Sequence, residues 1–146
     1  MNNKLALIDT NILIYASDES SIFQDKARRF LEKKLPFKNL CLTIQNLTEF
    51  YAIVTNPKRV KNSLNQNQAL KTIKSYLDSG LFQIIIPKPT TVIRITDLLG
   101  KYLIKDKEIH DLHLAAVMMD NGVKTIYTAD TKIFNRLGLR AINPLK

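Results

Sequence analysis

The chain has 146 residues, of which 22 are Lys or Arg and 13 are Asp or Glu, so its formal net charge at pH 7 is +9. This length suits one domain over residues 1–146, and the excess of positive charge favours a polyanionic partner, nucleic acid first. The single cysteine, Cys41, excludes an internal disulfide, and no apolar stretch is long enough for a membrane span or a signal peptide, so we expect a cytoplasmic protein.

The N-terminal part of the chain alternates between strand and helix patterns. Apolar residues 5–8 indicate a short buried strand, and residues 12–16 begin a helix or turn. Apolar residues at helical spacing then predict a helix with Ser20 or Ser21 as N-cap, which Pro36 ends.

A second strand is expected at residues 40–42, followed by a helix that Thr43 caps. The apolar stripe of this helix consists of Ile44, Leu47, Tyr51 and Val54. Residues 56–68 are polar and contain Pro57, so they predict a loop.

The rest of the chain continues the alternation. Gly80 is expected just past the end of a helix, and Asp106 or Asp111 opens a later, largely buried one. The expected elements are helices at 69–77, 92–103, 111–120 and 131–137, and strands at 82–86, 125–128 and 141–142. Strands that alternate with helices indicate an α/β fold with a mainly parallel central sheet.

Four acidic residues, far apart in the sequence, each stand beside an apolar run. They are Asp9, Glu49, Asp111 and Asp130. Burying a lone carboxylate is costly, whereas four that converge would form a cage of oxygen ligands for a hard divalent cation. Asp9 and Asp130 both follow expected strands, and the carboxyl ends of parallel strands form the ligand crevice of such sheets.

Each acid also has an ordinary structural interpretation. Asp9 and Asp130 are suitable N-caps, and Asp111 suits the start of a helix through the helix dipole. Glu49 lies nearly opposite the apolar stripe of its helix, as a solvated surface residue would. It reaches the crevice only if the helix has a second face, made of Gln45, Glu49 and Ala52.

Other kinds of site have less support. His110 and His113 flank Asp111, but the chain has no third His for a zinc site. The sequence also lacks a nucleophile elbow and any glycine-rich phosphate loop.

Four blocks of the sequence together resemble the PIN domain, and more narrowly the VapC-type toxins of toxin–antitoxin pairs. The blocks lie in family order over nearly the whole chain, at residues 7–14, 47–50 with 55–57 after it, 110–116 and 127–134. The resemblance implies a three-layer α/β/α fold and Mg²⁺- or Mn²⁺-dependent endoribonuclease activity. It also implies a homodimer and a cognate antitoxin that occupies the active-site groove.

The resemblance assigns metal ligation, directly or through water, to Asp9, Glu49, Asp111 and Asp130. Asn11 and the Thr128 hydroxyl would steady the ligands or the attacking water. Our hypothesis is that one or two Mg²⁺ ions activate water for attack on an RNA phosphodiester, which would leave 5′-phosphate and 3′-hydroxyl ends.

The other nine acidic residues face 22 basic ones, so the acids would lie inside a basic field that gathers phosphates. The candidate phosphate contacts are Lys58, Arg59, Lys61, Arg94, Lys132 and Arg136. One alternative is a catalytically silent PIN-like module that binds RNA or protein. Another is a haloacid-dehalogenase-like phosphatase, which Asn11 disfavours because that class has an Asp two residues after the first.

Overall fold

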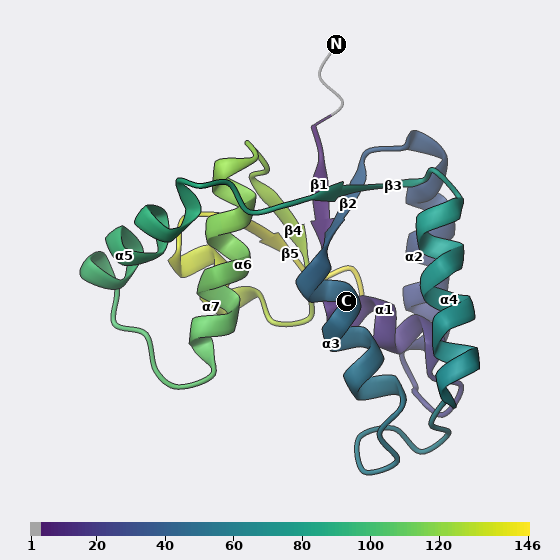
Figure 1. Cartoon of the computed structure of the whole chain (residues 1–146). Helices are drawn as coiled ribbons and strands as arrows, with labels where there is room; N and C mark the ends of the chain where they lie inside the picture. Colours follow the sequence, from purple (N-terminus) through teal and green to yellow (C-terminus); the bar gives the residue numbers. More distant parts are fainter. Residues whose placement is uncertain (1–3) are drawn as a thin grey trace.

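The computed structural model describes residues 4–146 and contains, within them, a parallel five-stranded sheet (Figure 1). Its strands are β1 (Ala6–Ile8), β2 (Leu40–Thr43), β3 (Phe82–Ile85), β4 (Thr125–Tyr127) and β5 (Arg140–Ile142). Their spatial order is β3-β2-β1-β4-β5, so the first strand of the chain lies at the centre. All four strand pairs are parallel, as the alternating pattern predicted.

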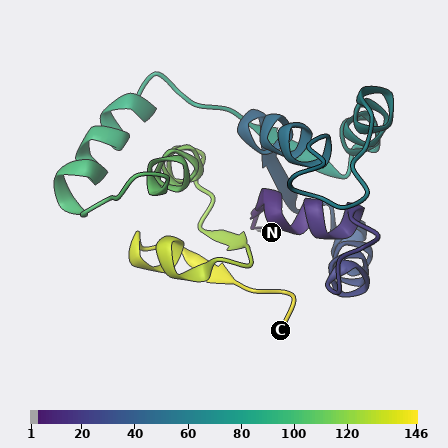
Figure 2. The same ribbon diagram turned by 90° about the horizontal axis from the view of Figure 1, so that it is seen from below.

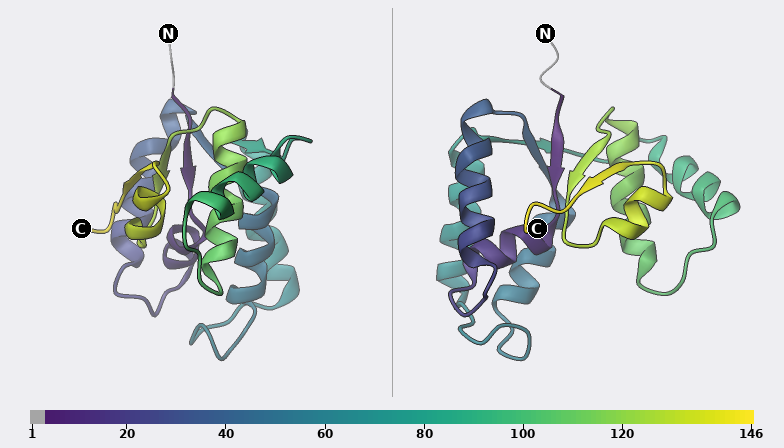
Figure 3. Two further views of the ribbon diagram at one scale, coloured as in Figure 1. Left: turned by 90° about the vertical axis from the view of Figure 1, so that its left-hand side faces the viewer. Right: turned by 180° about the vertical axis from the view of Figure 1, so that it is seen from behind.

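Helices cover both faces of the sheet (Figures 1 and 3). They are α1 (Thr10–Ser17), α2 (Gln24–Lys34), α3 (Ile44–Val54), α4 (Gln66–Asp78), α5 (Thr91–Lys101), α6 (Glu108–Asp120) and α7 (Thr131–Arg136). The view from below separates helices α1 to α4 from helices α5 to α7 (Figure 2). The predicted three-layer α/β/α fold is therefore confirmed.

The alternation of side chains along the strands explains these layers. Leu7 and Cys41 pack into one buried cluster with α6 and α7, whereas Ile8 and Leu42 pack into a second cluster with α1 to α4. The central strands β1 and β2 are buried on both faces, which is why their sequences are almost continuously apolar. Burial also raises the pKa of the Cys41 thiol to about 12, as expected of a core residue.

Most predicted turns and caps are confirmed, but two predicted helix starts are wrong. Neither Asp106 nor Asp111 opens α6, which begins at Glu108 after Lys107. The Thr43 hydroxyl accepts a hydrogen bond from the backbone N–H of Asn46 at 3.1 Å, and Gly80 follows α4 with a φ of 66°. Neither Ser20 nor Ser21 caps α2, because that helix begins later, after Phe23. The Ser21 hydroxyl instead accepts from the N–H of Phe23 within the preceding turn.

The predicted apolar stripe of α3 is partly wrong. Ile44 is 57% exposed, and the side chains that this helix buries fully are those of Asn46, Phe50 and Val54. Apolarity alone missed this face because a polar residue, Asn46, lies on it with its hydrogen bonds satisfied. The loop after α3 is also shorter than predicted, since α4 already begins at Gln66, which Asn65 caps.

Helix α5 lies at the outer side of its layer and packs mainly against α6. The apolar residues of the predicted helix 92–103 are therefore only partly buried: Ile95 and Leu98 join the core, whereas Val92, Leu99 and, beyond the end of α5, Leu103 are exposed. Within residues 4–146, no helix combines the length and the hydropathy that crossing a bilayer requires.

Candidate metal and active site

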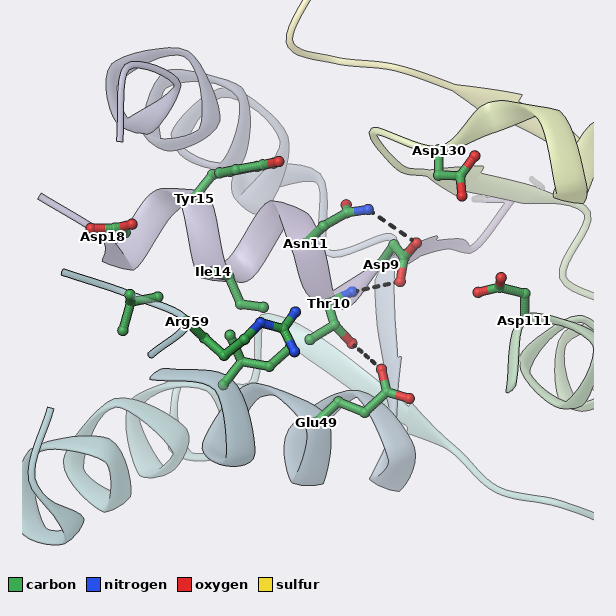
Figure 4. A pocket seen from close by; sticks show the side chains of 12 residues that line it. Asp9, Thr10, Asn11, Ile14, Tyr15, Asp18, Glu49, Arg59, Asp111 and Asp130 are labelled. Carbon is green, nitrogen blue, oxygen red and sulfur yellow. Dashed lines mark hydrogen bonds between the residues drawn. The ribbon is translucent and has the colours of Figure 1, made fainter. Parts of the chain in front are cut away.

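The four predicted acids line one pocket at the carboxyl end of the sheet (Figure 4). Asp9 directly follows β1, and Asp130 follows β4, the next strand in the sheet. The strand order changes direction between β1 and β4, because β2 and β3 lie on one side of β1 and β4 and β5 lie on the other. Open α/β sheets form their ligand crevice at such a point. Glu49 reaches the pocket from α3 and Asp111 from α6, and the pocket has a volume of about 350 Å³.

Asp9 is held rigidly, and it is both a helix cap and a site residue. Its Oδ1 accepts the N–H of Thr10 at 2.7 Å, which begins α1. Its Oδ2 accepts the Thr128 hydroxyl at 2.7 Å and, more weakly, the Asn11 amide at 3.5 Å. The carboxylate is buried in spite of its charge, so these three donors fix its position.

Asp130 behaves differently, because its carboxylate makes no capping hydrogen bond to α7. Its backbone N–H instead donates to the Thr128 hydroxyl at 3.0 Å. The same hydroxyl donates to Asp9, so Thr128 links the two acids that follow β4 and β1. Asn11 supports this link by accepting the N–H of Ala129 at 3.2 Å, which leaves the Asp130 side chain free toward solvent.

Three residues position Glu49, and the sequence patterns predicted this role for none of them. The Thr10 hydroxyl donates to Glu49 Oε2 at 3.2 Å and itself accepts the amide of the fully buried Asn46 at 3.1 Å. Gln45 donates to Glu49 Oε1 at 3.0 Å and to the carbonyl of His110 at 3.2 Å. The T-x-x-N spacing of the helix cap at Thr43 was the available signal for Asn46, which the cap holds in place.

The second face that Glu49 requires does exist on α3, but its composition differs from the prediction. Gln45 and Glu49 share this face, as predicted. Ile53, one turn beyond Glu49, lines the pocket in place of the exposed Ala52. This face belongs to the side of α3 near α1, and its residues, Gln45, Glu49 and Ile53, follow one another at intervals of four.

Two of the acids carry strongly perturbed pKa values. Burial raises the pKa of Asp9 to about 6, and the neighbouring charges of Glu49 and Asp130 act in the same direction. The hydrogen bonds from Thr128 and Thr10 lower this pKa but do not offset the burial. Burial, followed by the charges of Asp9, Asp130 and Glu49, raises the pKa of Asp111 to about 7. The pocket thus concentrates negative charge that no basic residue of the described chain neutralises by an ion pair.

The donor chemistry of the pocket suits a divalent cation. Its four converging acids offer carboxylate oxygen atoms, which are the ligands that hard divalent cations prefer. Across residues 4–146, however, no three Asp, Glu, His or Cys side chains are gathered tightly enough to hold one ion. A bound ion therefore needs water among its ligands or a rotation of these side chains inward, and Mg²⁺ commonly keeps several waters.

These pKa values predict how the stability of the metal-free protein depends on pH. Asp9 and Asp111 hold more protons when folded than when unfolded, since their pKa values rise from 3.8 to about 6 and about 7. Their contribution to the free energy of unfolding is therefore greatest below pH 4 and is lost as pH rises through 6 and 7. In EDTA, the Asp111→Asn variant should lose less stability than the wild type between pH 5 and 8, measured by urea unfolding. Equal losses would contradict this prediction.

The structure separates the six predicted phosphate contacts into two groups. Arg59 lines the acidic pocket, Lys58 and Lys61 are exposed in the same loop, and Lys132 is exposed two residues after Asp130. Arg94 and Arg136 are instead engaged in ion pairs, with Asp120 at 2.7 Å and Glu108 at 3.2 Å. Neither of these two arginines lines the acidic pocket.

The chain belongs to the PIN domain family, whose model matches residues 6–139. No curated protein sequence matches it significantly. Among solved structures, it is similar to the toxin VapC20 of Mycobacterium tuberculosis, with a TM-score of 0.73 and 16% identity over 95% of this chain and 99% of that one.

Two further solved structures show the same fold. VapBC2 of Rickettsia felis, bound to a promoter DNA fragment, matches with a TM-score of 0.67 and 23% identity over 95% of this chain and 98% of that one. FitAcB of Neisseria gonorrhoeae matches with a TM-score of 0.68 and 17% identity over 96% of this chain and 98% of that one. At such identities the likeness concerns the fold, so function has to be argued from the site.

Proposed function

We propose that the protein is a metal-dependent endoribonuclease, the toxin of a type II toxin–antitoxin system. The observation that carries the proposal is the pocket at the strand ends, where Asp9, Glu49, Asp111 and Asp130 accumulate negative charge and, within residues 4–146, form no ion pair. Membership of the PIN domain family supports this activity, as does similarity to VapC20, which is described as a Sarcin-Ricin loop cleaving toxin.

In this proposal the four acids hold Mg²⁺ or Mn²⁺, as one or two ions. A bound ion would supply Lewis acidity and lower the pKa of a coordinated water. Thr128 and Asn11 orient Asp9, and Thr10 and Gln45 orient Glu49, so two of the four carboxylates have fixed positions and water would complete the coordination of the ion. The exposed Lys58, Lys61 and Lys132 attract the RNA phosphates to this edge of the sheet.

The experiment that tests the proposal is cleavage of total cellular RNA by the purified protein in Mg²⁺, in Mn²⁺ and in EDTA. We expect cleavage only with a divalent ion, and products that carry 5′-phosphate and 3′-hydroxyl ends. Cleavage that persists in EDTA would overturn the metal mechanism. Tight RNA binding without cleavage under any condition would instead favour a catalytically silent RNA-binding module.

We propose two protein partners, a cognate antitoxin and a second copy of the chain. One similar solved structure is described as a toxin–antitoxin complex, which supports the antitoxin. Exposed apolar side chains on and around β3 and α5 support a protein contact there: Ile84, Ile86, Val92, Ile93, Leu99 and Leu103. Light scattering of the purified chain, alone and co-expressed with the product of the adjacent gene, tests both partners. A monomer that captures nothing would contradict them.

A further inference from the structure

The acidic pocket continues beyond the four acids into a half with different chemistry. We propose that this half, formed by Ile14, Tyr15, Asp18, Ile53, Arg59 and Val60, is a subsite for one RNA nucleotide next to the cleaved phosphodiester. The subsite would select a base that carries an amino group. This inference rests on the proposed nuclease function and assigns part of its substrate preference.

Helical spacing sets the shape of the subsite. Thr10 and Ile14 lie one helical turn apart on α1, and Asp18, the residue that caps the C-terminal end of this helix, lies at the far end of the pocket. Glu49 and Ile53 repeat this spacing on α3, which packs against α1. Figure 4 shows Asp18 and Asp111 at opposite ends of the pocket, with Ile14 and Arg59 between them. A volume of about 350 Å³ is at the small end of ligand sites, so the pocket holds little more than one nucleotide.

Apolar side chains give this half of the pocket a surface suited to a base. Ile14, Tyr15, Ile53 and Val60 all line it, and none lies within the acid cluster. The ring of Tyr15 is braced by an edge contact with Phe23, with ring centroids 5.2 Å apart. Single-stranded RNA is commonly recognised by unstacked bases that lie on such aromatic and apolar surfaces.

Arg59 is the basic residue that lines the pocket, and backbone hydrogen bonds hold its loop in place. The N–H of Arg59 donates to the carbonyl of Asn56 at 2.9 Å, and Val60 is buried beside it. Leu64 closes the loop through a 2.7 Å hydrogen bond to the carbonyl of Val54. Within residues 4–146 the guanidinium forms no ion pair. It is therefore available to an RNA phosphate, which it can bind with two parallel hydrogen bonds.

Asp18 supplies a carboxylate oxygen at the far end of the subsite. Its Oδ1 is occupied, because it accepts the N–H of Ser20 at 3.0 Å and the Ser20 hydroxyl at 2.6 Å. Its Oδ2 has no hydrogen-bond partner in the described part of the chain. A fixed carboxylate accepts from the exocyclic amino groups of adenine, cytosine or guanine. Uracil offers only its N3–H, which lies between two carbonyl oxygens that repel a carboxylate.

The test uses short single-stranded RNAs that differ only in the base at one position, each position being varied in turn. Cleavage in Mg²⁺ and binding by fluorescence anisotropy in EDTA are measured for the wild type and for Asp18→Asn. We expect the wild type to disfavour uridine at one position by at least about fivefold, the smaller end of a specific base contact. Asp18→Asn keeps the acceptor for Ser20 but turns the free oxygen into an amide, so this discrimination should vanish or reverse.

Two matched controls isolate the subsite. Glu19→Gln removes the same charge from the next residue, which does not line this pocket, and should leave the base preference unchanged. Arg59→Ala should weaken RNA binding about tenfold, a loss that Arg59→Lys only partly restores, whereas Lys58→Ala should weaken binding less.

The outcomes distinguish the subsite from the nuclease function. If the wild type cleaves RNA and Asp18→Asn keeps the wild-type base preference, the subsite is wrong and the nuclease stands. If nothing is cleaved but the wild type binds with a base preference that Asp18→Asn removes, the subsite stands and the nuclease fails. If the wild type neither cleaves nor binds RNA, both are overturned.

Discussion

Replacing Asp9 with Asn is expected to lower RNA cleavage by more than about 100-fold and to leave the protein folded. Even residues that only orient metal ligands typically change affinity or activity by about 10–100-fold, and Asp9 would be a ligand itself. The fold tolerates the change, because an Asn side chain can still accept the N–H of Thr10 that begins α1. It also removes a buried charge whose pKa is raised to about 6.

The expected stability of this variant separates a catalytic defect from misfolding. In EDTA at pH 8, Asp9→Asn should resist urea at least as well as the wild type, because the buried charge costs stability there. Asp25→Asn is a suitable control, since it removes one charge from an exposed position in α2. Wild-type cleavage by Asp9→Asn, or a marked loss of its stability at pH 8, would contradict this interpretation.

The strands were predictable because they are apolar runs in the sequence, and the acids were predictable because they lie beside such runs. A parallel strand buried on both faces gives such a run, and the residue that follows it lies at the carboxyl edge of the sheet. Asp9 and Asp130 could thus be placed at one edge before their distance was known. The starts of helices follow from local patterns as well. At Thr43, for example, a residue type that favours the N-cap position comes directly before the helix.

The supporting residues were harder to predict because they depend on the angle between elements. Asn46 and Thr10 are polar residues with ordinary local roles, and only the crossing of α1 and α3 makes them neighbours that hold Glu49. The same crossing brings Ile53 rather than Ala52 to the pocket. Charge patterns likewise failed to show that Arg94 and Arg136 are paired, since their acidic partners, Asp120 and Glu108, lie more than 25 positions away.

Replacing Thr128 with Val should be the most damaging change outside the acids. The hydroxyl of this fully buried residue donates to Asp9 Oδ2 and accepts the N–H of Asp130, and Val has the same shape without either bond. A carboxylate and an amide would each lose a buried partner, which costs about 1–3 kcal/mol per group. Thermal unfolding should show the loss of stability, and cleavage should fall by about 10–100-fold because Asp9 loses its orientation.

Thr128→Ser is the informative companion, because it restores the hydroxyl while removing only a methyl group. If the hydrogen bonds carry the effect, Ser should recover most of the cleavage that Val loses. Thr125→Val makes the same chemical change three residues earlier in β4, at a position with no hydrogen bond to the site, and should leave cleavage near the wild-type level. If Thr128→Val cleaves RNA as fast as Thr125→Val, the link between Asp9 and Asp130 has no role in positioning the acids.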